Sequence, residues 1–122
     1  YDSALKYARE RVQFGKPIFE FQAIQHKLAE MATGIQSAHL MVYYAAWLID
    51  RNIPCNKEAA MTKLVASETA NKVADECTRI FASYGFSMEY PAQRYFRDAR
   101  FLLLGGGTSE ILKNIIAKEI GL

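Results

Sequence analysis

Residues 21–50 of the chain read FQAIQHKLAEMATGIQSAHLMVYYAAWLID. Apolar side chains recur in this stretch at alternating spacings of three and four residues, at Phe21, Ile24, Leu28, Met31, Ile35, Ala38, Val42, Ala45 and Ile49. The pattern is a heptad seam of about four repeats, which predicts one helix of roughly 45 Å. A helix this long is usually paired along its length with others, so the stretch predicts a helix bundle.

The apolar face of this stretch is wider than the seam alone. Off-seam positions add Leu40, Met41, Tyr43, Tyr44, Trp47 and Leu48. So wide a face indicates burial against more than one neighbour. The neighbours could be other helices of a thick single-domain core or a second subunit.

Helical patterns also precede and follow the long stretch. From Asp2 to Phe14, one face carries Leu5, Ala8 and Val12, and Gly15-Lys16-Pro17 is expected to end that helix. A third helix is expected from Lys57 to Tyr84, with Asn56 as its N-cap. Its many alanines allow close approach of other helices, which predicts a central position.

Two shorter helices are expected near the C-terminus, from Ala92 to Leu103 and from Ile111 to Ile120. No alternation of β-branched residues predicts strands. The predicted fold class is therefore all-α, an antiparallel up-and-down bundle of four main helices plus an N-terminal helix end.

Size and composition narrow the function. A chain of 122 residues fits one domain, and a net charge of +2 is too small to indicate nucleic-acid binding. No apolar run is long enough to span a bilayer. Cys55 and Cys77 have no metal-binding spacing and fit a reducing, cytosol-like compartment. Because the first residue is Tyr1 and not methionine, we expect a piece of a longer protein.

The turn Leu104-Gly-Gly-Gly-Thr-Ser-Glu110 is the main candidate for a site. Three glycines allow a large group to approach the backbone closely, and the helix start behind them suits an anionic or oxygen-rich ligand. A flexible connector with a threonine or serine N-cap explains the same residues, and the turn alone favours the connector.

Other chemistry finds little support in the sequence. His26 and His39 have no hydrolytic context, and no carboxylates or Glu-x-x-His motif are spaced for a metal. Arg11 precedes the Phe14-Gly15 turn, where a guanidinium could bind a pyrophosphate. Gln22 could offer an amide at the start of the long helix. On position alone, both are ordinary surface residues.

Taken jointly, five motifs resemble the C-terminal helical domain of the acyl-CoA dehydrogenases. They are Arg11-Val-Gln-Phe14-Gly15-Lys-Pro17, Phe21-Gln22-Ala-Ile-Gln25-His-Lys-Leu28-Ala-Glu-Met31, Tyr84-Gly85-Phe86 with Glu89-Tyr90-Pro91, Arg94-Tyr-Phe-Arg97-Asp98-Ala99 and Gly107-Thr108-Ser109-Glu110-Ile111. They occur in the order of the family and extend over essentially the whole chain.

The resemblance implies an FAD-dependent oxidoreductase of fatty-acid metabolism that converts an acyl-CoA to the trans-2-enoyl-CoA. A carboxylate removes the α-proton, the β-hydrogen passes to the flavin as hydride, and electron-transfer flavoprotein takes the electrons. It also implies an N-terminal helical domain and a middle β-domain outside residues 1–122, and a homotetramer or a heterotetramer with a paralogue. A cytoplasmic location follows, or the mitochondrial matrix in a eukaryote. The fragment alone is expected to be inactive.

The resemblance also assigns residues. Arg11 and Gln22 match positions that hold the FAD of a neighbouring subunit, and Phe14 matches an apolar contact with that cofactor. Thr108, Ser109 and Glu110 match a helix start near FAD. The matching cofactor segment before Gly85 consists of Arg79, Ile80, Phe81, Ala82 and Ser83. Gly106 and Gly107 border the thioester of the substrate, and no metal ligands are expected.

Two departures from the family pattern bear on function. Arg79 replaces the usual glutamine, and Ala82-Ser83 replaces the usual double glycine. Gly106 occupies the position of the catalytic glutamate of many members, and a glycine cannot abstract a proton. No catalytic residue is therefore expected in the chain, and the base is expected upstream of residue 1, as in the isovaleryl-type branch.

Two other functions remain open. A non-catalytic subunit could use the bundle for assembly alone. An acyl-CoA oxidase relative would pass its electrons to oxygen and form peroxide.

Overall fold

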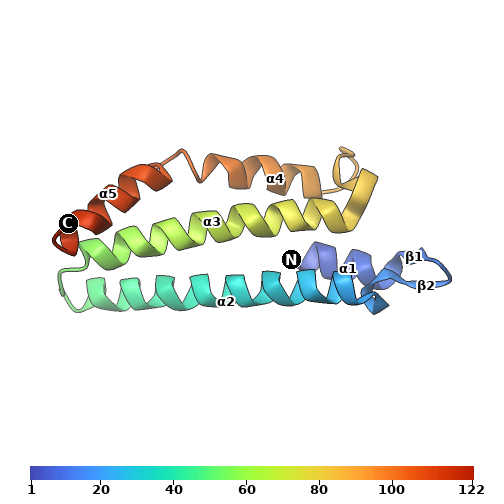
Figure 1. The fold of residues 1–122 in the computed structure, drawn as a ribbon, viewed down its shortest axis with the longest axis horizontal. Coiled ribbons are helices and arrows are strands. Elements are labelled where there is room, and N and C mark those ends of the chain that lie inside the picture. The colour runs from blue at the N-terminus through green and yellow to red at the C-terminus, as the bar shows by residue number, and fades with distance from the viewer.

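The computed structural model describes residues 1–122, and helices make up most of it (Figure 1). In chain order the elements are α1 (Asp2–Glu10), β1 (Val12–Gln13), β2 (Lys16–Pro17), the 3₁₀ turn η1 (Ile18–Glu20), α2 (Gln22–Asp50), α3 (Asn56–Phe81), the 3₁₀ turn η2 (Ala82–Gly85), α4 (Ala92–Phe101) and α5 (Ser109–Glu119). The predicted all-α class is confirmed.

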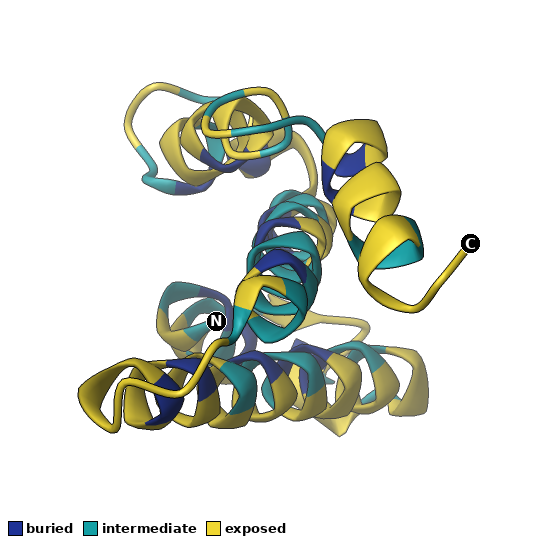
Figure 2. Ribbon diagram, turned by 90° about the vertical axis from the view of Figure 1, so that its left-hand side faces the viewer, coloured by how far each residue is buried: buried dark blue, intermediate teal, exposed yellow.

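Helix α3 lies at the centre of the bundle (Figures 1 and 2). It contacts α1 and α2 on one side and α4 and α5 on the other. Helix α2 runs antiparallel to α3, and α4 and α5 lie nearly in line, antiparallel to α3 on its far side. The predicted central position of the alanine-rich helix is confirmed, because α3 is the element that all other helices share.

The predicted seam of α2 is correct in its first half and only partly correct in its second. Leu28, Met31, Ala38 and Ala45 are buried, but Val42 and Ile49 are exposed and Leu48 is buried instead. The reason is that α3 alone covers this half of α2. One neighbour buries a narrow stripe, and the rest of the apolar face stays open (Figure 2).

The first helix ends earlier than predicted. It stops at Glu10, and Val12 lies exposed in β1, where it pairs with Pro17 in a two-residue antiparallel hairpin. The turn residues Phe14 and Gly15 both have positive φ, 52° and 83°. Two successive positive φ values are typical of the tight turn that joins hairpin strands. The prediction that the chain has no strands was wrong at this one place.

Both ends of α3 also differ from the prediction. Asn56 is the first residue of the helix and not its N-cap; Cys55 precedes it and makes no side-chain cap bond. The helix ends at Phe81, three residues before Tyr84, because Ala82 adopts a φ of 53°. Positive φ is costly for alanine and interrupts the right-handed helix.

The main apolar core lies at one end of the bundle, which we call the hairpin end. It consists of Ala4, Ala8, Ile18, Leu28, Met31, Cys77, Ile80, Phe81 and Ala92. Only 19 of 122 residues are buried in the chain as a whole, and large apolar side chains such as Tyr43, Ile49 and Ile111 are exposed. The isolated chain therefore leaves much of its apolar surface uncovered.

Candidate functional site

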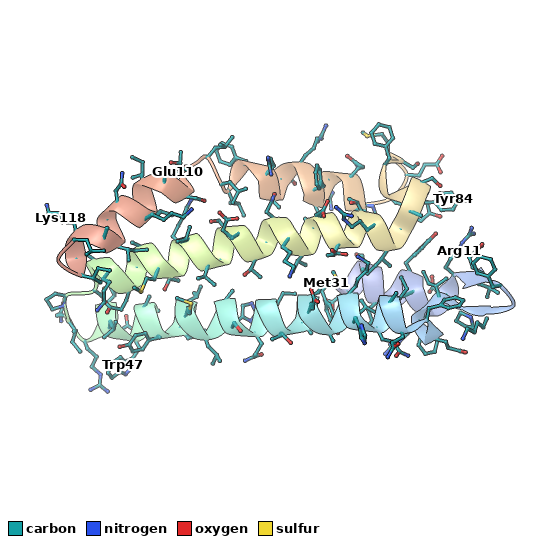
Figure 3. The ribbon with its side chains drawn as sticks, viewed as in Figure 1. Arg11, Met31, Trp47, Tyr84, Glu110 and Lys118 are labelled. Carbon is teal, nitrogen blue, oxygen red and sulfur yellow. The ribbon has the colours of Figure 1, made fainter.

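The sequence-predicted site residues form two groups in the structure. Arg11, Phe14, Gln22 and the segment from Arg79 to Ser83 lie at the hairpin end. Thr108, Ser109 and Glu110 lie at the junction of α4 and α5, beside the middle of α3 (Figure 1), and we call the half of the bundle from this junction onward the glycine-turn end. Figure 3 shows Arg11 beside Tyr84 at the hairpin end, with Glu110 on the far side of α3 in the other half of the bundle.

Arg11 follows the last residue of α1, where its backbone N–H donates to Tyr7 O. Its guanidinium lies over the ring of Tyr84, 5.5 Å from the centroid, and forms no ion pair. The ring restrains the cation without neutralising it. Arg11 therefore keeps N–H donors and a full positive charge available for an anionic group.

Tyr84 packs against a cluster of aromatic side chains. The Tyr7 ring stacks on Phe81 at 4.2 Å, and Tyr90 contacts Phe81 at 5.5 Å and Tyr84 at 5.2 Å. Burial raises the pKa of the Tyr7 hydroxyl, although the positive charge of Arg11 opposes that change. The cluster joins α1, α3 and the loop after η2 behind the guanidinium.

Phe14 and Gln22 lie on the exposed side of the same end. Phe14, at the tip of the hairpin, is 92% exposed and meets Phe21 edge to face at 6.1 Å. Gln22 is the first residue of α2 and is exposed. An apolar ring and an amide thus extend from this end toward whatever covers it.

Only some side chains of the segment from Arg79 to Ser83 are exposed to solvent. Arg79 is exposed and donates to the Asp75 carboxylate at 2.7 Å, a contact that raises the pKa of Arg79. Ile80 and Phe81 are buried in the core, so only their backbone can reach a ligand. Ala82 and Ser83 are exposed.

A cleft of about 670 Å³ opens beside this segment. Its lining includes Thr78, Arg79, Gly85, Phe86 and Arg97. Gly85 cannot carry a side chain there, because a Cβ would lie 2.4 Å from the Thr78 carbonyl oxygen. The lining also includes Asp75, which pairs with Arg79, so Arg97 is the arginine of the cleft without a carboxylate partner. One free guanidinium beside apolar side chains suits a ring system that carries negative charge.

At the glycine-turn end, Gly106 and Gly107 have φ values of 70° and 98°. Glycine adopts positive φ without steric cost, which explains why glycine occupies both positions. A Cβ on Gly106 would meet nothing within 4 Å, so the space beside this residue is not filled by other atoms of the chain. The backbone N–H groups of Gly106, Gly107 and Thr108 donate to no acceptor in the chain. The turn therefore presents free donors for the oxygen atoms of a ligand.

The start of α5 is fixed by side-chain hydrogen bonds. Thr108 is the N-cap, as the sequence predicted for Thr108 or Ser109, and its hydroxyl accepts the Ile111 N–H at 3.4 Å. Ser109 is buried and donates to the Glu68 carboxylate at 2.6 Å. The pKa of Glu110 is lowered by its own backbone N–H and by the Thr108 hydroxyl, so its carboxylate stays ionised.

Two residues of α3, which the sequence analysis did not single out, contact the glycine turn. Lys63 Nζ donates to Leu102 O at 2.8 Å and to Gly107 O at 2.6 Å, and Glu68 accepts the Ser109 bond. A lysine and a glutamate in an alanine-rich helix resemble ordinary surface residues. Only the packing of α5 on α3 brings them to the turn.

The two groups of residues lie too far apart to act on one small ligand in a single chain. Their contacts on α3, Glu68 and Phe81, are thirteen residues apart, which corresponds to roughly 20 Å of helix axis. Arg11 and Glu110 also lie on opposite sides of α3 (Figure 3), whereas Arg79 and Ala82 border a cleft on the α4 side.

Other kinds of site have little support. No group of three or more His, Cys, Asp or Glu side chains could hold a metal ion. His26 and His39 are exposed on α2. None of the helices has both the length and the apolar character needed to cross a membrane.

The family model described as "Acyl-CoA dehydrogenase, C-terminal domain" matches residues 1–121. Benzylmalonyl-CoA dehydrogenase of Aromatoleum aromaticum is 62% identical over 118 residues, which are 97% of this chain and 31% of that protein. Butyryl-CoA dehydrogenase of Megasphaera elsdenii superposes with a TM-score of 0.96 at 39% identity, over 98% of this chain and 31% of that one. An FAD complex of PigA superposes with a TM-score of 0.95 at 30% identity, over 99% of this chain and 32% of that one. The chain thus spans about a third of the length of these relatives.

Proposed function

The chain belongs to the acyl-CoA dehydrogenase family, as its C-terminal domain, and from this membership we propose that the protein carrying it is an FAD-dependent acyl-CoA dehydrogenase. The reaction is the α,β-dehydrogenation of an acyl-CoA thioester to the trans-2-enoyl-CoA. An N-terminal helical domain and a middle β-domain complete the enzyme. Electron-transfer flavoprotein is the proposed electron acceptor, in the cytoplasm or the mitochondrial matrix.

The observation that carries this proposal is the state of Arg11. Its guanidinium is held over Tyr84 and has no carboxylate partner, whereas Lys27 and Arg79 at the same end are paired with Glu76 and Asp75. A fixed cation with free N–H donors fits a pyrophosphate, which accepts paired hydrogen bonds from a guanidinium. The residues present therefore fit FAD.

Each group of residues has a proposed task. Arg11, Gln22 and Phe14 hold the nucleotide half of FAD, with Arg79 and the cleft next to Ala82 and Ser83 as its border. Thr108, Ser109 and Glu110 hold the flavin side, and the open backbone at Gly106 and Gly107 admits the thioester. Bound FAD would supply the acceptor for the two electrons and the β-hydrogen of the substrate.

The separation of the two groups supports a cofactor shared between subunits. Because α3 lies between Arg11 and the start of α5, Arg11 of one subunit would serve the FAD that contacts Thr108 of another. The exposed apolar side chains of α2 and α5, such as Tyr43, Trp47 and Ile115, suit the buried faces of a tetramer. The proposed assembly is a homotetramer, or a heterotetramer with a paralogue.

The catalytic base is proposed to lie outside the 122 residues. Gly106 has no side chain, and the two carboxylates near the turn are already engaged. Glu68 accepts the Ser109 hydroxyl proton, and Glu110 accepts N–H and hydroxyl donors at the helix start. A helical carboxylate upstream of Tyr1 and facing the turn is the candidate, and its absence from the whole protein would count against an active enzyme.

The test is FAD retention by the whole protein after Arg11→Ala. Loss of a charge-assisted contact worth about 1.5–3 kcal/mol should weaken FAD binding about 10- to 150-fold with unchanged helix content. Arg11→Lys should retain part of the affinity, because it keeps the charge but not the fork. Arg9→Ala is the matched control, an exposed arginine one position before the helix end, and should change nothing. Unaltered FAD occupancy in Arg11→Ala after gel filtration would contradict the proposed role.

A non-catalytic assembly subunit is the second candidate, favoured by the glycine at position 106. It predicts a protein that supports the activity of a partner but shows no turnover alone. Bleaching of the flavin absorbance by an acyl-CoA under anaerobic conditions separates the two, since only a catalytic protein reduces its own flavin. Peroxide formation in air would instead identify an oxidase.

A further inference from the structure

We propose that Lys63 is a positioning residue that aims the Thr108 backbone N–H at an oxygen atom of the bound ligand, an inference that rests on the proposed function. Lys63 lies on α3. Its ammonium donates to two carbonyls, Leu102 O at 2.8 Å and Gly107 O at 2.6 Å.

The two acceptors lie on either side of residues 103–106. Leu102 follows the last residue of α4, and Gly107 precedes the N-cap of α5. One ammonium therefore ties the end of one helix to the start of the next across Gly105 and Gly106. The turn has few other restraints, because the backbone bonds around it end at Gly105, whose N–H donates to Phe101 O at 2.8 Å.

Because the peptide bond is planar, the contact of Lys63 with Gly107 O also fixes the direction of the Thr108 N–H. Gly107 C=O and Thr108 N–H belong to one trans peptide unit, in which the two groups point in opposite directions. When Lys63 holds the Gly107 oxygen toward α3, the Thr108 N–H must point away from α3. That N–H has no acceptor in the chain, so it is free to donate to a ligand.

The Gly107–Thr108 peptide unit needs this restraint because the glycines beside it do not restrict the backbone. Gly106 and Gly107 have no side chains and access a wide range of φ and ψ, so an unrestrained peptide unit would rotate. Ordering one residue costs about 1–2 kcal/mol, which a ligand would otherwise have to offset on binding. Lys63 imposes this order before the ligand arrives, and the binding site is preorganised.

The acceptor is an oxygen atom, which either FAD or the thioester carbonyl could provide. Two assays on the whole protein separate these sources. The first is the dissociation constant of FAD for the apoprotein without any CoA compound. The second is the ratio of dissociation constants between an S-alkyl-CoA thioether and its acyl-CoA thioester, for the tightest of butyryl-, octanoyl- and 3-phenylpropionyl-CoA. The thioether lacks the carbonyl oxygen and is otherwise matched.

Lys63→Met keeps the apolar stem and removes the donors. We expect it to weaken FAD binding about tenfold if FAD supplies the oxygen, or to lower the thioester preference about tenfold if the substrate does. Lys72→Met is the control on the same helix, since Lys72 pairs with Glu30 on the surface and should leave both quantities unchanged. A folded Lys63→Met protein with both quantities unaltered would overturn the inference.

A second variant covers the case in which Lys63→Met does not fold. Lys63→Arg keeps the charge and N–H donors, but its longer side chain and planar fork do not match the geometry in which one ammonium donates to both carbonyls, so we expect about a threefold loss in the same assay. No loss in this variant contradicts the inference. The wild-type protein distinguishes the two levels of proposal. If it holds no FAD and binds none of the three thioesters, the proposed function itself fails; if it binds them and only Lys63 proves neutral, the inference alone fails.

Discussion

The hairpin end and the glycine-turn end of the bundle are built by different means. At the hairpin end, Phe81, Tyr7, Met31 and Leu28 pack into the main core, and aromatic rings contact one another directly. At the glycine-turn end, α4 and α5 are joined to α3 through polar contacts from Lys63 and Glu68, with Leu112 as a lone buried large side chain on α5. The difference indicates that one end is stabilised by burial and the other is ordered by a few directed bonds.

The largest expected effect comes from cutting into the core of the hairpin end. Phe81→Ala should destabilise the whole protein by about 3–5 kcal/mol, because the ring is 3% exposed and its removal leaves a cavity against Tyr7. Denaturation by urea, followed by circular dichroism, measures the loss. Phe86→Ala removes the same side chain from a site that is 91% exposed and should cost less than about 1 kcal/mol. Equal losses in the two variants would contradict the location of the core.

The matching change at the glycine-turn end should cost less and act locally. Ser109→Ala leaves the Glu68 carboxylate without its hydroxyl donor and should destabilise by about 1–2 kcal/mol. Hydrogen exchange should rise in peptides that cover residues 105–115 and stay constant in α1. A rise spread evenly over the bundle would show that the two ends unfold as one unit and would remove the contrast between them.

A smaller effect is expected from the ring beneath Arg11. Tyr84→Leu removes the cation–π contact but keeps an apolar side chain, and should weaken FAD retention by about two- to fivefold, or about 0.5–1 kcal/mol. Tyr95→Leu is the control, since Tyr95 lies on α4 outside the cluster. A loss as large as that of Arg11→Ala would mean that Tyr84 binds FAD directly.

The smallest effect concerns Cys77 in the core. Burial raises the pKa of the Cys77 thiol, so the folded protein keeps this proton at a pH at which the unfolded chain has lost it. The contribution of this group to stability is therefore complete below about pH 8.5 and declines above it. Cys77→Ala should flatten that alkaline decline, whereas Cys55→Ala should not. Peptide mapping after alkylation at pH 8 should find Cys55 modified and Cys77 protected until denaturant is added.

The sequence predicted the fold well where periodicity carries the information. The long α2, the central α3 and the cap at Thr108 follow from spacing, small residues and N-cap chemistry. It failed where a single backbone angle decides the structure. The first helix ended early because Arg11 has an extended backbone, and α3 ended early because Ala82 has a positive φ. Neither residue type predicts such an angle.

The site was predictable only in part, for a related reason. Arg11, Gln22 and the glycine turn were found through motifs that resemble a family, and their roles stay predictions. Lys63 and Glu68 were missed because their partners, backbone oxygens of the glycine turn and the Ser109 hydroxyl, lie some forty residues away along the chain. Side-chain-to-backbone contacts of that range depend on packing, which local sequence does not encode.

The alanine at position 82 has a consequence for the order of folding. Its φ of 53° is a conformation that alanine avoids on its own, at a cost of about 1–2 kcal/mol, and the neighbouring Gly85 is held against the Thr78 carbonyl. A turn that its own residues disfavour should form late, after α4 has docked on α3. Ala82→Gly would then slow unfolding and leave the folding rate nearly unchanged. The reason is that removing the cost of positive φ stabilises only the native state, since the turn is not yet formed in the transition state. The junction between α3 and α4 would be the last part of the bundle to form.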